Sequence, residues 1–265
     1  VTPFAVITDK EEHKKYPLTD YALTPSVAII DPMFTLSLPK RIVADTGMDV
    51  LTHATEAFVS TLANDYTDGL CIQSIKMVFK YLERSYNNGA EDFEAKEKMH
   101  NASCLAGMAF ANAFLGMNHS MAHKIGGEFH VPHGRANAIL LPFTIRYNGQ
   151  QPTKLSTWPK YNYYQAAERY AELARVLGLP AKTTAEGVES YAKACGELAM
   201  KIGIEMNFQS QGINETEYLN SIDNLAFLAY EDQCSPANPR VPIVEDIKNI
   251  LKEAYYTKEF FPKEK

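Results

Sequence analysis

Apolar residues recur with helical spacing along most of the chain, and only its first part carries short runs of another kind. Residues 4–8 and 27–31 are rich in β-branched and apolar side chains, and Pro25 and Pro32 bound the second run, so each run is predicted to form a strand. An isolated pair of strands is only marginally stable in water. The two strands therefore indicate the remnant of a sheet that continues before Val1.

From residue 38 onward, the pattern predicts a series of helices with local start and stop signals. Small residues are frequent in the helix expected over 92–114, which indicates close helix contacts inside a bundle. Capping boxes are expected at Thr183 with Glu186 and at Asn214 with Glu217. The further helices are predicted over 40–44, 48–60 after Gly47, 68–88 closed by Asn88 and Gly89, 118–125 before a turn at Gly126 and Gly127, 136–146 kinked or interrupted at Pro142, 165–177 and 243–255. The predicted fold class is mostly α, a helical bundle.

Composition excludes several classes of protein. The 265 residues are 46% apolar and 22% charged, which suits a globular chain with one large core or two modest ones. The net charge is −6 and Lys/Arg runs are short, so no nucleic-acid partner is expected. No uncharged apolar stretch approaches the roughly 20 residues of a membrane span. The four cysteines lie far apart, as expected of reduced thiols in a cytoplasmic protein.

Histidines gather in one short segment, FLGMNHSMAHKIGGEFHVPHG, which contains His119, His123, His130 and His133. If 118–125 is helical, His119 and His123 are i,i+4 neighbours on one face. His133 can return toward the same place after Pro132. His130 is a candidate pocket residue, whereas His13 and His100 lie among charged residues and are expected to face solvent.

A second chemical pattern lies upstream, in ADTGMDVLTHATEAF. Asp49 and His53 are four residues apart on a predicted helix whose polar face Glu56 shares. A carboxylate and an imidazole at this spacing can bind a metal, although such a pair is more often a simple surface pair. Asp49, His53, His119 and His133 form a candidate set of four ligands.

Two long segments resemble a known family. DTGMDVLTHATEAF and GMNHSMAHKIGGEFHVPHGRANAILLP are similar to signature segments of the iron-dependent (group III) alcohol dehydrogenases. The tail YEDQCSPANPRVPIVEDIKNILKEAYY is similar, more narrowly, to the alcohol dehydrogenase half of bifunctional aldehyde/alcohol dehydrogenases. The resemblance implies the dehydroquinate synthase-like fold of this family. Residues 1–38 would then end a nucleotide-binding α/β domain that is otherwise absent, and 39–265 would form the helical metal-binding catalytic domain.

The resemblance also implies roles for single residues. The family's metal ligands fall on Asp49, His53, His119 and His133, its proton-relay histidine falls on His123, and a lysine that contacts the cofactor ribose falls on Lys15. The implied metal is Fe(II), with Zn(II) as an alternative in purified protein, and the implied cofactor is NAD(H). The implied partners are short primary alcohols and aldehydes, ethanol and acetaldehyde first, and further copies of the chain in a dimer or a filament.

The sequence contains neither GxGxxG nor GGGS, the glycine-rich turns that hold a dinucleotide pyrophosphate. The chain by itself is therefore expected to bind metal, but not to bind NAD(H) tightly or to oxidise alcohols. Two other functions stay open from the residues alone. One is a helical metallohydrolase, in which metal-bound water attacks a phosphate or amide, and the other is a structural fragment whose helices are held together by a metal. The strands at the start and the sequences around each ligand favour the dehydrogenase.

Overall fold

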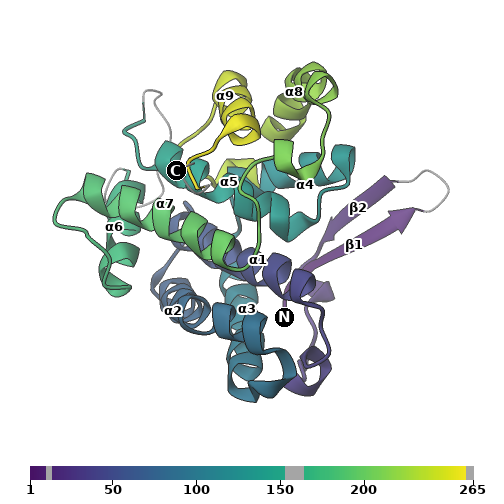
Figure 1. The fold of residues 1–265 in the computed structure, drawn as a ribbon, viewed down its shortest axis with the longest axis vertical. Coiled ribbons are helices and arrows are strands. Elements are labelled where there is room, and N and C mark those ends of the chain that lie inside the picture. The colour runs from purple at the N-terminus through teal and green to yellow at the C-terminus, as the bar shows by residue number, and fades with distance from the viewer. Residues whose placement is uncertain (10–13, 153–163, 261–265) are drawn as a thin grey trace, which may run out of the picture.

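The computed structural model describes residues 1–9, 14–152 and 164–260, and within these ranges it is mostly helical, as predicted (Figure 1). A two-stranded sheet comes first, and helices make up most of the rest. The strands are β1 (Phe4–Asp9) and β2 (Lys14–Thr19), and the α-helices are α1 (Lys40–Val59), α2 (Asp65–Asn88), α3 (Phe93–Ala113), α4 (Met117–Phe129), α5 (His133–Asn148), α6 (Ala166–Val176), α7 (Thr184–Lys201), α8 (Glu215–Tyr230) and α9 (Val244–Tyr256).

Helix α1 runs through the middle of the molecule and organises the core. It packs against α2 and α3 on one side and against α5 on the other, while α4, α8 and α9 extend the α5 side (Figure 1). Met48, Leu51 and Phe58 of α1 are fully buried between these layers. The apolar residues that predicted an amphipathic helix here thus form the centre of a helical bundle.

Two glycine signals were misread as helix breaks. The helices expected over 40–44 and 48–60 are one helix, α1, which continues through Gly47. A Cβ atom at Gly47 would lie 2.2 Å from Cδ1 of Leu82, so the glycine serves the close contact with α2 rather than a turn. Helix α4 likewise continues through Gly126 and Gly127, and the chain turns at His130, whose φ is 55°.

Several helix ends agree with the local signals. Helix α2 ends where Asn88 and Gly89 predict, and Gly89 has a φ of 59°. It begins at Asp65 rather than Asp68, because Asn64 caps the helix together with Thr67. Helix α5 passes through Pro142 without interruption.

The predicted capping residues Thr183 and Asn214 do accept bonds from the amides of Glu186 and Glu217. The Glu186 carboxylate, however, accepts from the backbone amide of Lys182 at 2.6 Å rather than from that of Thr183, which a capping box requires.

The first predicted strand is confirmed and the second is wrong. Strand β1 pairs in antiparallel fashion with β2, so that Phe4 lies opposite Thr19 and Thr8 opposite Lys15. Residues 27–31 form no strand, and Val27 and Ile29 are 77% and 86% exposed. β-branched composition marks a segment that suits a sheet, but a strand also needs a neighbouring backbone with which to pair.

The β1–β2 hairpin is joined to the bundle by ring contacts. The ring of Phe4 lies 5.8 Å from that of Phe110 on α3, and the ring of Phe110 stacks on His53 of α1 at 4.6 Å. A continuous row of rings therefore leads from the hairpin to α1. In the part of the chain that is described, no helix is long and apolar enough to cross a membrane, and all four cysteines are free thiols.

Candidate metal centre

Three helices bring the predicted ligands together. Asp49 and His53 lie on α1, His119 lies on α4, and His133 is the first residue of α5. The start of α5 rests directly on α1, because a Cβ atom at Gly134 would lie only 2.0 Å from the carbonyl oxygen of Asp45. Glycine at this position therefore allows His133 to lie beside Asp49.

The ligand atoms of Asp49, His119 and His133 converge on one point. Oδ1 of Asp49 lies 3.7 Å from Nε2 of His119 and 3.6 Å from Nε2 of His133. One ligand atom from each of the three residues lies within 4.8 Å of the other two. His53 adjoins this group, with Nδ1 3.7 Å from Oδ2 of Asp49 and its ring 4.4 Å from that of His119.

An amide that the sequence analysis did not identify lies at the centre of the group. Nδ2 of Asn137 is 2.7 Å from Oδ1 of Asp49 and 3.1 Å from Nε2 of both His119 and His133. Its orientation is set by Asn118, whose Nδ2 donates to Oδ1 of Asn137 at 2.9 Å. When neither Nε2 atom carries a proton, two amide hydrogens cannot serve all three acceptors fully, and one acceptor is left over. One carboxylate and two imidazole nitrogens are ligands that suit a divalent transition metal.

Glu56 orients His119, and its burial corrects the expectation that it lies on a polar face. Its carboxylate is 3% exposed, accepts the Asn118 amide at 2.8 Å and forms a short hydrogen bond with Nδ1 of His119. Nε2 of His119 is thereby directed at Asp49. A carboxylate behind a histidine is the usual second layer of a metal site, since it fixes the ring and its tautomer.

Burial changes the proton affinity of this pair in opposite directions. Burial raises the pKa of Glu56 to about 8, although the bonds from Asn118 and His119 oppose the shift. Burial also lowers the pKa of His119 well below its usual range, and the neighbouring histidines add to the effect. Without a metal, burial thus disfavours charge on both groups, whereas a cation on Nε2 of His119 would favour a Glu56 carboxylate that accepts from Nδ1–H.

We expect the free energy of unfolding of the metal-free chain to fall as the pH rises from about 6.5 to about 8. In this range folded Glu56 retains a proton that unfolded Glu56, with an ordinary pKa of 4.5, has lost. Below about 6.5 the unfolded chain protonates His119 while the folded chain does not, which offsets the Glu56 effect. The expected loss is about 1 to 2 kcal/mol.

Urea unfolding at several pH values after dialysis against a chelator measures this slope. Glu56→Gln should abolish it, whereas Glu94→Gln, which changes an exposed carboxylate, should leave it intact. A slope that persists in Glu56→Gln would contradict the assignment.

His123 lies beside the ligand group and has its own carboxylate partner. Its ring is nearly parallel to that of His133, at 5.3 Å and 11°. Nδ1 of His123 lies 3.1 Å from Oδ2 of Asp232, a residue that the sequence analysis missed. Burial opposes ionisation of Asp232, but the bonds from His123 and Lys124 outweigh it and hold the pKa of this carboxyl well below its usual range.

His123, Asp232 and Cys234 also place one ligand atom each within 4.8 Å of one another. However, Nζ of Lys124 already lies 2.8 Å from Oδ2 of Asp232. An ammonium at this position disfavours a second cation there. The arrangement fits a carboxylate that orients His123 better than it fits another metal site.

The remaining residues that the sequence analysis considered, His130, His100, Lys15 and His13, are not part of the candidate ligand group. His130 follows the last residue of α4 as its cap and is exposed. His100 is half-buried on α3 and lines a cavity rather than facing open solvent. Lys15 lies in β2, where the structure describes only its backbone pairing with Thr8. His13 lies outside the described residues.

Comparison with known proteins now gives the family. Residues 43–255 match the family model described as "Fe-containing alcohol dehydrogenase family, C-terminal". The chain is 64% identical over 256 residues to the aldehyde-alcohol dehydrogenase of Streptococcus pneumoniae serotype 4, which covers 97% of this chain and 29% of that protein. The chain thus spans less than a third of the length of this relative.

Solved structures agree with the sequence match. A 1,3-propanediol oxidoreductase superposes with a TM-score of 0.84 at 33% identity, covering 96% of this chain and 62% of that one. The sulfoacetaldehyde reductase of Bifidobacterium kashiwanohense in complex with NAD+ superposes with a TM-score of 0.81 at 28% identity, covering 97% and 62%. The chain therefore belongs to the Fe-containing alcohol dehydrogenase family.

Proposed function

We propose that Asp49, His53, His119 and His133 bind one divalent metal and that the complete enzyme interconverts short primary alcohols and aldehydes with NAD(H). The observation that carries this proposal is the convergence of Asp49, His119 and His133 on the single amide of Asn137. The three acceptor atoms that surround the Asn137 amide are better satisfied by a cation than by two amide hydrogens. The buried Glu56 carboxylate supports such a site by holding the ring of His119 in place.

The resemblance names Fe(II) as the metal, and the family description agrees with iron. Zn(II) binds the same nitrogen and oxygen donors and stands above Fe(II) in the general order of affinity, so zinc can replace iron in purified protein. When bound, either ion would supply Lewis acidity toward an alcohol or aldehyde oxygen.

His123 is the proposed proton-transfer residue. Its Nδ1 donates to Asp232, which leaves Nε2 as the ring atom able to exchange a proton with a substrate hydroxyl. The ring is half-buried, so Nε2 can pass a proton between the site and solvent. Asp232 is a positioning residue in this scheme, because it fixes the tautomer and the direction of the ring without reaching the substrate.

The nicotinamide cofactor would be held largely outside the described residues. Lys15 is the proposed contact to its ribose, and residues 1–38 the proposed end of the nucleotide-binding domain. The resemblance supports both assignments. The choice of NAD(H) is further supported by the solved structure of the related sulfoacetaldehyde reductase, which is in complex with NAD+. The rest of β2 after Lys15, the sequence YPLT, contains no glycine and so no glycine-rich turn.

A chimera tests the function. Residues 1–265 would replace the corresponding part of the Streptococcus pneumoniae aldehyde-alcohol dehydrogenase, to which they are 64% identical. We expect the chimera to reduce acetaldehyde with NADH once loaded with Fe(II). The 265-residue chain alone should bind metal but show no saturable NADH binding below about 1 mM, because it lacks the backbone amides that hold a pyrophosphate.

Asp49→Ala in the chimera should abolish alcohol and aldehyde turnover while its NADH binding persists. Hydrolysis of a phosphate ester by the loaded chain, with no aldehyde reduction by the chimera, would instead identify a metallohydrolase. Micromolar NADH binding and aldehyde reduction by the 265-residue chain itself would show that the cofactor site lies within these residues.

A further inference from the structure

A cavity of about 130 Å³ lies apart from the metal-site residues, and none of the residues that line it belongs to the candidate ligand group. It is a partly open pocket that lies between the short 3₁₀-helix η2 (Pro32–Thr35) and helices α1, α2 and α3. Its lining is apolar at positions that include Leu38, Val50 and Met99, and its polar residues are Thr35, Thr46, Ser85, Lys96, His100 and Ser103. A concave site that combines apolar surface with polar groups able to orient a ligand is typical of small-molecule binding.

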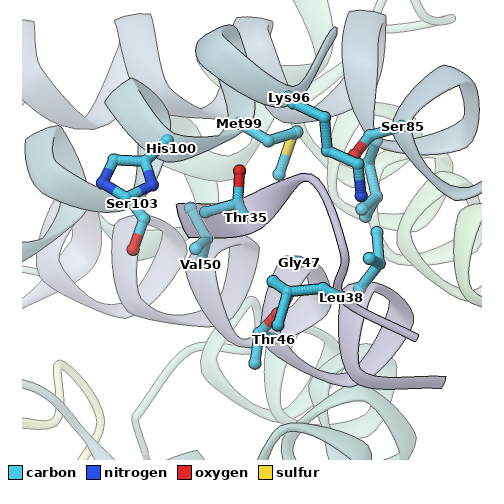
Figure 2. A pocket seen from close by; sticks show the side chains of 12 residues that line it. Thr35, Leu38, Thr46, Gly47, Val50, Ser85, Lys96, Met99, His100 and Ser103 are labelled. Atoms are coloured by element: carbon cyan, nitrogen blue, oxygen red, sulfur yellow. The ribbon is translucent and has the colours of Figure 1, made fainter. Parts of the chain in front are cut away.

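One of the lining residues is a buried lysine. Lys96 on α3 is 2% exposed, and within the described residues its Nζ has no hydrogen-bond partner. Figure 2 shows its side chain ending beside Ser85 and Leu38, at the end of the cavity opposite His100 and Ser103. Burial lowers the pKa of Lys96, because the charged form has lost its water.

The carboxylates near Lys96 in the sequence already have other partners. Asp92 and Glu94 both pair with Arg84 at 2.9 Å, and Glu97 pairs with Lys98 at 3.4 Å. No aspartate or glutamate lines the cavity. A buried ammonium is stable only with a counter-charge and hydrogen bonds, so the surroundings of Lys96 call for an anion from outside the described residues.

The shape and charge of the cavity restrict that anion. A cavity of 150 Å³ is known to hold benzene, so 130 Å³ suits a molecule of about four to six non-hydrogen atoms. One lysine balances one negative charge, and no other described lysine or arginine lines the cavity to balance the second charge of a phosphate. The apolar walls can bury a short alkyl chain.

We propose that this cavity binds a short-chain monocarboxylate, with its carboxylate on Lys96 and its alkyl chain against Leu38, Val50 and Met99. The hydroxyl of Ser85, at the same end of the cavity, is a further donor for the carboxylate. The proposal is independent of the function assigned to the metal centre, since it uses no residue of that group.

Calorimetric titration of the 265-residue chain with sodium butyrate, at constant ionic strength, tests the proposal. We expect saturable binding of one butyrate per chain and a higher melting temperature, with neither effect from equal concentrations of chloride or inorganic phosphate. Lys96→Met should weaken butyrate binding at least tenfold, because a charge-assisted hydrogen bond is lost. Lys98→Met, two residues along the same helix, should bind butyrate like the original chain.

Lys96→Met is expected to fold, because it removes a buried charge and keeps an unbranched side chain. Val50→Phe provides a second variant, which fills the cavity while leaving Lys96 in place, and it should also lose butyrate. Butyrate bound at a metal would survive both substitutions. Equal binding by the original chain and Lys96→Met, or stronger binding of phosphate than of butyrate, would overturn the proposal.

Discussion

Replacing His119 with alanine is expected to remove the metal from the protein. The side chain is 1% exposed and its Nε2 faces Asp49, so the substitution removes one proposed ligand from a buried position. The substitution also leaves Glu56 without its imidazole partner. Because loss of an outer-layer partner alone lowers metal affinity about 10- to 100-fold, loss of the ligand should lower it at least 100-fold.

Metal analysis after loading with Fe(II) under anaerobic conditions, or with Zn(II), measures the effect. The original chain should retain about one equivalent after dialysis and His119→Ala almost none. Asp49→Asn is the companion variant, since it keeps the shape of a half-buried side chain while removing its charge. His130→Ala, which changes an exposed histidine of the same segment, is the matched control. Undiminished metal content in His119→Ala would show that His119 is not a ligand and that the proposed site is wrong.

Replacing His123 with alanine should lower turnover by about 100- to 10,000-fold, the usual range for a general acid–base residue, while metal content stays within about twofold. The reason is its position beside the ligand group, with Nδ1 occupied by Asp232 rather than aimed at Asp49. Turnover is measured in the chimera with acetaldehyde and NADH, and metal content is measured on the same samples.

Two comparisons separate proton transfer from structural damage. His100→Ala changes a half-buried histidine on α3 and should leave both turnover and metal content unchanged. Asp232→Asn keeps a hydrogen-bond acceptor for His123 and should lower kcat more than it raises KM. Loss of metal from His123→Ala in proportion to the loss of turnover would make His123 a ligand and the proposed role wrong.

Sequence spacing located the candidate site because its main parts are local. Asp49 and His53 lie four residues apart on one helix, as do His119 and His123, and helical geometry alone puts each pair on one face. The residues that support the candidate ligands and His123, namely Glu56, Asn137 and Asp232, instead depend on contacts between distant segments. Asp232 meets His123 from 109 positions away in the sequence, and no local pattern encodes that contact.

Glu56 and Asn137 show two kinds of missed signal. Glu56 was assigned to a polar face because a carboxylate is normally solvated, and only the packing of α4 on α1 reveals that it is buried. Asn137 did leave a trace, as a polar residue one turn after His133 and directly before the apolar run AILLPF. Gly47 misled for the opposite reason, since its lack of a side chain serves a contact with Leu82 and not a turn.

The row of rings from Phe4 through Phe110 to His53 has a mechanical consequence. Aromatic rings in contact cannot shift independently, because a gap between them forfeits much of their attraction. The placement of the β1–β2 hairpin and the tilt of one imidazole beside Asp49 are thus a single geometric variable. A molecule that displaces the hairpin would therefore change the orientation of His53 through these ring contacts, without itself contacting Asp49, His119 or His133.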